Sequence, residues 1–211
     1  MPVPILVFLD VQHRGKPSPH HGDTGAGSGG YADREVGFTG RLALGLHAAF
    51  YDGGAAVCPI SDGHYSDRHS RAVAYAAIWR SGLLVTERAA ARVVYLALHA
   101  NAGGGQYALL GHDHRSARGL SLAADVRRAM VQAAIPEPPA GKQADVRVVA
   151  GKPGTTWEHV YNTIDGVYAG LPTALCLEPV FLDQPAHDRY RDGAGLDALV
   201  KSVVAGVRHA G

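Results

Sequence analysis

The sequence lacks several features that mark common protein classes. Only two of its 211 residues are cysteine, and two cysteines cannot build a disulfide framework. Cys58 and Cys176 each stand inside an apolar run, so we expect two buried structural thiols. No apolar run reaches the roughly 18 residues that a membrane-spanning helix needs, so we expect no membrane span.

Charge is also scarce. Lysine and arginine number 20 and aspartate and glutamate 19, and together they make up 18% of the chain. A net charge near zero, without a basic stripe, offers no surface for nucleic acid. The first ten residues have no basic region ahead of their short apolar run, so they do not resemble a secretion signal. We therefore expect a protein made in the cytoplasm that binds no nucleic acid.

Apolar residues, in contrast, are plentiful. They make up 46% of the chain, which is enough to build a substantial core in one domain. Six short and nearly continuous apolar runs predict strands covered on both faces, as in parallel sheets. These runs are Pro4–Leu9, Ala55–Ile60, Val93–His99, Tyr107–Gly111, Val146–Val149 and Thr173–Leu177.

Segments with helical periodicity lie between these runs. They are Glu35–Phe50, Asp67–Ser81, Ser116–Ala134 and Gly195–Ala210, with a further turn or two over Leu83–Arg92. The apolar face of the first helix is Val36, Leu42, Leu46 and Phe50. Ser66 is the expected N-cap of the second helix. The alternation predicts one α/β domain over residues 1–211, with a mostly parallel twisted sheet of about six strands flanked by helices on both faces.

Polar residues stand where three of the predicted strands end. His13 follows the first strand, His99 ends VVYLALH, and Glu178 ends TALCLE. In open α/β sheets, binding sites lie beyond the carboxyl ends of the strands. Glu35 begins the helix after the long Gly-, Pro- and Ser-rich loop Arg14–Asp33, and loops of that length are often functional. We expect these four side chains to gather at one edge of the sheet.

Two histidines and one carboxylate form a common catalytic zinc site with an open fourth position. A water molecule at that position has a pKa of about 7, and a second carboxylate beside it acts as general base. The sequence therefore offers His13, Glu35 and His99 as ligands of one zinc ion and Glu178 for proton transfer. Taken singly, each residue is also explained as a polar side chain that meets solvent at the end of an element.

At these residues the chain resembles the zinc-dependent N-acetylmuramoyl-L-alanine amidases that have an Asp-Pro-Gly-His-Gly-Gly turn. The similarity extends over about residues 5 to 209. The Leu-His-Ala-Asn part is its most specific piece, and Arg68 stands at the position of an arginine that follows the family's second strand. The segments that carry it are VFLDVQHRG, DTGAGSGGYADREVGF, YSDRHSRAVAYA, LALHANAGGG and CLEPVFLDQPAHD.

The resemblance implies the family's activity, which is hydrolysis of the peptidoglycan amide between N-acetylmuramic acid and L-alanine. The family's zinc ligands fall on His13, Glu35 and His99, and its catalytic glutamate falls on Glu178. The resemblance thus implies one bound Zn²⁺ and peptidoglycan as the partner.

Residues around the site add detail to this hypothesis. We expect Asn101 and Arg14 to contact the substrate, and Asp10 to orient one of the zinc-binding histidines. The chain departs from the family pattern near the site but keeps the metal and acid–base residues. The departures are Val11-Gln12 for Pro-Gly, Arg14 for Gly, Val180 for Gly, and Asp183 or Gln184 for Asn.

The sequence shows no wall-binding repeat, so we expect a single catalytic domain without a separate wall-binding domain. We also expect a monomer. A phage or prophage endolysin, which reaches the wall after release or through a holin-type pore, fits this expectation, and so does a spore-related or intracellular amidase. One alternative is a zinc hydrolase of the same fold that cuts another peptide or polyglutamate amide. A second is a non-catalytic wall-binding module, whose signature would be loss of Glu178.

Other motifs favour different chemistry less strongly. The segment Gly25–Gly30 matches a dinucleotide-binding pattern but does not lie directly between a strand and a helix. His112 and His114 share one face of an extended segment and suggest either a metal site or a solvated strand end. His20 and His21, in the Gly-rich loop, are candidates for substrate contact or gating. No G-x-S-x-G elbow supports a serine hydrolase.

Overall fold

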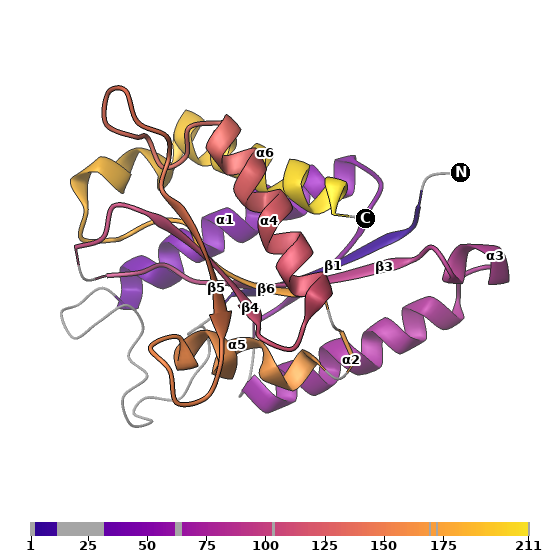
Figure 1. Cartoon of the computed structure of the whole chain (residues 1–211). Helices are drawn as coiled ribbons and strands as arrows, with labels where there is room; N and C mark the ends of the chain where they lie inside the picture. Colours follow the sequence, from indigo (N-terminus) through magenta and orange to yellow (C-terminus); the bar gives the residue numbers. More distant parts are fainter. Residues whose placement is uncertain are drawn as a thin grey trace.

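Six strands form one sheet in the computed structural model, which describes residues 3–11, 32–61, 65–102, 104–168, 170–171 and 173–210. The strands are β1 (Ile5–Val11), β2 (Ala56–Ile60), β3 (Arg92–Leu98), β4 (Ala108–Asp113), β5 (Val146–Gly151) and β6 (Ala174–Glu178). Their order across the sheet is β2-β1-β3-β6-β4-β5, and only the β4–β6 pair is antiparallel among them. The predicted mostly parallel sheet is confirmed (Figure 1).

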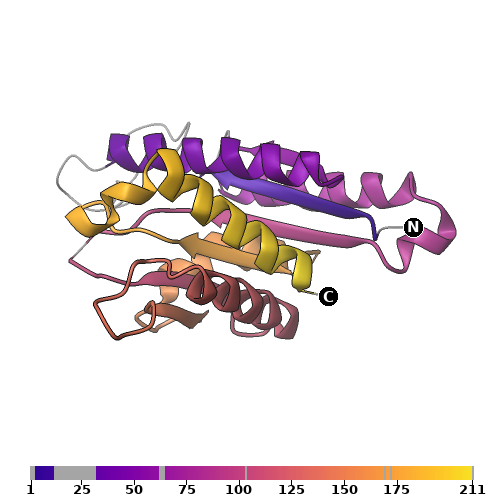
Figure 2. The ribbon, with the colours of Figure 1, turned by 90° about the horizontal axis from the view of Figure 1, so that it is seen from above.

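Helices cover both faces of this sheet. On one face lie α1 (Ala32–Asp52), α4 (Ala117–Gln132) and α6 (Gly193–His209), which Figure 2 shows from above. On the other face lie α2 (Tyr65–Ser81) and α5 (Glu158–Tyr168) (Figure 1). The short helices α3 (Val85–Arg88) and η1 (Pro185–Tyr190) lie in connections between longer elements. No helix in the described ranges is both long and apolar enough to cross a membrane.

The strands are buried on both faces, and their side chains alternate between two cores. In β1, Val7 and Leu9 join the core beneath α1, α4 and α6, whereas Leu6 and Phe8 join the core beneath α2 and α5. A side chain of this size contributes about 1.5–3 kcal/mol when it is fully buried. The same period of two decides which face each polar residue near a strand end can reach.

The sequence predicted most of these elements. The ends of all six predicted strands shift by no more than two residues, and the four long predicted helices are present. The N-cap prediction for Ser66 was wrong, because α2 already begins at Tyr65. The prediction that Val36 lies on the buried face of α1 was also wrong, because Phe38 is fully buried there and Val36 is only half-buried.

Helix α5 was missed for a clear physical reason. Its sequence, EHVYNTIDGVY, consists mostly of residues with low helix propensity. However, Val160, Ile164 and Val167 recur at helical spacing and are fully buried against the sheet. Tertiary packing of this stripe therefore overrides the weak local preference.

The two cysteines differ in their surroundings. Cys176 is fully buried in β6, which confirms the prediction of a structural thiol. Cys58 is only half-buried because β2 is an edge strand, so the prediction was wrong for this residue. Both cysteines are free thiols. Burial raises the pKa of both, and the pKa of Cys176 lies well above the ordinary value of 9.0.

A buried ion pair joins β1 to α2. Arg68 Nη1 lies 2.6 Å from Asp10 Oδ1, and both side chains are completely inaccessible to solvent. The Tyr95 hydroxyl, from the neighbouring strand β3, donates to the other carboxylate oxygen of Asp10. Arg68 also donates to the backbone carbonyl of Val11 at 3.3 Å. The bonding of both carboxylate oxygens offsets the cost of burying the charge of Asp10.

We predict that Arg68→Ala lowers the free energy of unfolding by about 3–5 kcal/mol, because it leaves the Asp10 carboxylate buried without its cation. Urea denaturation measures this change. The matched control is Arg71→Ala on the exposed side of the same helix, which should change stability by no more than about 0.5 kcal/mol. Equal, small effects of the two substitutions would contradict the prediction.

Candidate active site

The carboxyl ends of β1, β3 and β6 meet at one edge of the sheet, because these strands are parallel neighbours. Leu98 at the end of β3 pairs with Leu177 of β6, so His99 and Glu178 follow side by side. The His99 backbone N–H donates to the Leu177 carbonyl at 2.9 Å and fixes this alignment. The predicted placement of His99 and Glu178 at one edge is confirmed.

Helix α1 brings Glu35 to the same edge. Glu35 lies on the buried stripe of α1 and is itself fully buried, one turn ahead of Phe38 and Thr39. Its Oε1 accepts a hydrogen bond from the Ala100 N–H at 3.0 Å and lies 3.3 Å from His99 Nδ1. The apolar stripe that anchors α1 therefore also delivers a carboxylate to the end of β3.

Glu35 and His99 fit a zinc site in donor type and spacing. Donor atoms about 2.0–2.1 Å from a tetrahedral zinc ion lie about 3.4 Å from each other, and the observed Oε1–Nδ1 distance is 3.3 Å. Among the described residues no group of three potential ligands is present. The third predicted ligand, His13, lies outside the described residues, as does Arg14.

Glu178 is held by several side chains. Its side chain is only 6% exposed. Oε2 accepts a hydrogen bond from Asn101 Nδ2 at 2.8 Å, and Oε1 lies 3.3 Å from His159 Nε2. The Cys176 thiol lies 3.6 Å from the same Oε1 and extends this network into the core. Glu178 is thus an oriented, nearly buried carboxylate, which suits a residue that transfers protons at a fixed position.

The position of Asn101 follows from backbone pairing beyond the strands. Its N–H donates to the Val180 carbonyl at 2.9 Å, and its own carbonyl accepts from the Leu182 N–H at 2.8 Å. The side-chain oxygen of Asn101 accepts from the Ala102 N–H at 2.8 Å, which turns the amide nitrogen toward Glu178. Asn101 therefore orients the proposed acid–base residue, while its contact with substrate stays a prediction.

His159 was missed by sequence reasoning. It is the second residue of α5, and its side chain is 51% exposed beside the Trp157 ring, 5.9 Å between centroids. The hydrogen bond to the Glu178 carboxylate raises the pKa of His159 above its ordinary value of 6.5, against the opposing effect of burial. The signal that could have found it is the alternation along β6, which turns Glu178 toward α5.

The remaining candidates lie elsewhere or make other contacts. His112 and His114 lie at the opposite edge of the sheet, because β4 runs antiparallel to β6. His112 is buried, so the prediction of a solvated strand end was wrong for it, and its Nδ1 lies 2.9 Å from the Asp113 carbonyl.

Asp10 contacts Arg68 and Tyr95, and its predicted role in orienting a histidine stays a prediction. Three further candidates lie outside the described residues: His20, His21 and Gly25–Gly30.

We predict that His159 titrates above 6.5 in the folded protein and that Glu178→Gln lowers its pKa toward 6.5, because the substitution removes the carboxylate charge. The Cε1 proton resonance, followed by NMR against pH, measures both values, with His47 on α1 as the internal control. Since folding raises this pKa, the contact stabilises the fold below about pH 6.5, and the contribution is lost as the pH rises through the folded-state pKa. An unchanged His159 pKa in the Glu178→Gln protein would contradict the contact.

Solved structures resemble this arrangement of strands and helices. The N-acetylmuramyl-L-alanine amidase Ami1 from Mycobacterium smegmatis aligns over 97% of this chain and 96% of its own, with a TM-score of 0.62 and 16% identity. The CwlD amidase from Clostridioides difficile, solved with the GerS lipoprotein, covers 98% of both chains, with a TM-score of 0.59 and 11% identity.

The catalytic domain of the CD27L endolysin, which targets Clostridia difficile, covers 97% of this chain and 96% of its own, with a TM-score of 0.54 and 17% identity. No family model matches the sequence, and no curated protein sequence matches it at a significant level. The chain therefore has the fold of solved N-acetylmuramyl-L-alanine amidases, at sequence identities that show the fold alone.

Proposed function

We propose that this protein is a zinc-dependent N-acetylmuramoyl-L-alanine amidase that hydrolyses the amide between N-acetylmuramic acid and L-alanine in peptidoglycan. The observation that carries the proposal is the meeting of Glu35, His99 and Glu178 at one edge of a sheet with the fold of such amidases. The sequence resemblance to the same family supports the proposal independently of the fold.

Glu35 and His99, together with His13, would hold the metal. When bound, zinc would polarise the scissile carbonyl and lower the pKa of a coordinated water to about 7. Glu35 contributes a negative charge that the sheet edge keeps away from solvent, so its attraction for a cation is weakly screened. The Ala100 N–H fixes the position of Oε1 before any metal arrives.

Glu178 would carry the protons. It takes one proton from the attacking water as the carbon–oxygen bond forms and delivers it to the alanine nitrogen as the carbon–nitrogen bond breaks. Asn101 Nδ2 holds one carboxylate oxygen at 2.8 Å, so the carboxylate cannot turn away between the two transfers. His159 Nε2 lies 3.3 Å from the other carboxylate oxygen, on the exposed side of Glu178.

The reaction is tested by incubating the protein with purified peptidoglycan and labelling the new termini. We expect release of N-terminal alanine without new reducing sugar ends, and loss of that release when zinc is chelated. New reducing ends without alanine would contradict the proposal by showing glycosidic cleavage. If a protein that binds one zinc ion releases no alanine from several wall types, the substrate is a different amide.

We predict that Glu178→Gln lowers kcat for this release by about 10²–10⁴-fold, because proton transfer loses its base, while the zinc content stays unchanged. Elemental analysis of the purified protein measures the zinc. The matched control is Glu87→Gln in α3, which makes the same chemical change at a residue that contacts the Leu84 backbone rather than the site. Full activity of the Glu178→Gln protein would exclude the assigned role.

A further inference from the structure

A cavity of about 500 Å³ lies at the edge of the sheet opposite the candidate active site. It is bordered by the last turn of α2, the residues after α3, the start of β3, and the first turns of α4. Strand β3 runs from the cavity to the candidate active site. It begins at Arg92, which lines the cavity, and His99 follows its last residue. Seven residues of strand at about 3.3 Å each span roughly 23 Å, so this cavity is distinct from the metal and acid–base residues.

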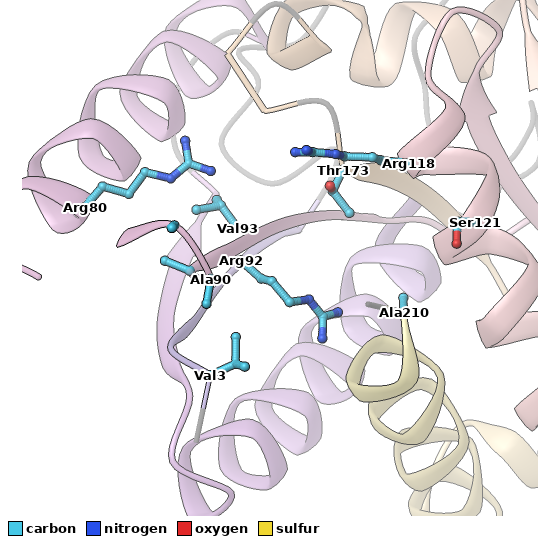
Figure 3. Close-up of a pocket in the computed structure, with 11 residues that line it drawn as sticks. Val3, Arg80, Ala90, Arg92, Val93, Arg118, Ser121, Thr173 and Ala210 are labelled. Carbon is cyan, nitrogen blue, oxygen red and sulfur yellow. The ribbon is translucent and has the colours of Figure 1, made fainter. Parts of the chain in front are cut away.

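Three arginines from different elements line the cavity. Arg80 comes from α2, Arg92 opens β3, and Arg118 lies in the first turn of α4. Figure 3 shows the guanidinium ends of Arg80 and Arg118 pointing toward one another, with Arg92 extending toward Ala210. The two guanidinium groups that face each other, those of Arg80 and Arg118, repel, and this repulsion costs free energy unless a counter-charge lies between them.

Among the described residues no acidic side chain lines this cavity, and the nearby Asp125 forms its ion pair with Arg128 instead. Arg92 instead donates to the carbonyls of Val207 at 2.5 Å and Arg208 at 3.2 Å, at the end of α6. Burial lowers the pKa of Arg92 more than the charge of Asp125 raises it. The cavity thus concentrates positive charge that the surrounding protein only partly offsets.

The rest of the lining is mixed in character. The segment Ala89–Ala91 and Val93 offer apolar contacts, while Ser121 and Thr173 each offer a hydroxyl group. Small-molecule sites of about 300–1,000 Å³ typically combine apolar walls with a few placed polar groups. Both the volume and the lining therefore suit a ligand with an apolar or sugar body and a strongly anionic end.

We propose that this cavity binds a small organic phosphate. A phosphate monoester carries about two negative charges at neutral pH, and its oxygens match the planar fork of arginine. The guanidinium groups of Arg80 and Arg118 would hold the phosphate, and the Thr173 hydroxyl, which Figure 3 shows beside Arg118, would add a hydrogen bond. The alanine wall would contact the rest of the molecule. A carboxylate carries one charge and leaves more of the repulsion between the arginines in place.

Isothermal titration calorimetry with phenyl phosphate as the probe tests this binding on the full chain. We expect one site per chain, an affinity that falls with salt, and weaker binding of inorganic phosphate and of benzoate. The Arg80→Gln/Arg118→Gln protein should bind phenyl phosphate about 100-fold more weakly, since each charged hydrogen bond contributes about tenfold or more. Arg71→Gln, on the exposed face of α2, is the matched control and should bind normally.

NMR of the unsubstituted chain locates the same probe without relying on variants. Phenyl phosphate should shift the backbone amides of residues 89–91 and 118–121. Shifts confined to residues 99–102 would instead place the phosphate at the candidate active site and overturn the proposal. The proposal also fails if phenyl phosphate does not bind, if the double variant binds as tightly as Arg71→Gln, or if benzoate or inorganic phosphate binds as tightly. All these readouts measure binding, so they are independent of the proposed amidase activity.

Discussion

The register between β3 and β6 determines where the described residues of the candidate site lie. Pairing of Leu98 with Leu177 sets His99 beside Glu178, and backbone hydrogen bonds continue beyond the strands through Asn101. Side chains on a strand alternate with a period of two, so a slip of one residue would turn Glu178 to the face covered by α1, α4 and α6. It would then lose contact with His159, which belongs to α5 on the other face.

Among the described residues three buried carboxylates lie near this edge, and their partners suit them to different tasks. Asp10 meets the guanidinium of Arg68, a permanent cation, and this contact suits a carboxylate that joins β1 to α2. Glu35 meets a backbone amide and the imidazole of His99, and both are compatible with a metal ion joining the pair. Glu178 meets the Asn101 amide and the imidazole of His159, and these contacts suit the proton-transfer role proposed for it. All three side chains are carboxylates, so their different surroundings, rather than their residue type, suit them to different tasks.

Much of the fold was predictable because the relevant signals are local. Continuous apolar runs marked all six strands, and the polar residues that end them pointed to His99 and Glu178. The position of Glu35 was predictable from its place at the start of an amphipathic helix. The reversed direction of β4 and β5 was not, because a six-residue apolar run carries no information on its orientation in a sheet.

The contacts that sequence reasoning missed join residues distant along the chain. His159 reaches Glu178 only because the weak helix former α5 is held in place by its buried stripe. The pairing of Asp10 with Arg68 spans 58 residues and depends on α2 packing against β1. The arginine cavity is assembled from α2, β3 and α4, and none of the three segments carries a recognisable binding motif alone. Such sites depend on tertiary structure and have no local signature.

Glu35 and His99 are proposed to form part of a zinc site beside Glu178. Diffraction from crystals grown with zinc, recorded on both sides of the zinc absorption edge, tests it most directly. We expect one anomalous peak within bonding distance of Glu35 and His99, with His13 as a further ligand and Glu178 close by but not bound. A zinc ion held by other residues, or no peak between Glu35 and His99, would contradict it.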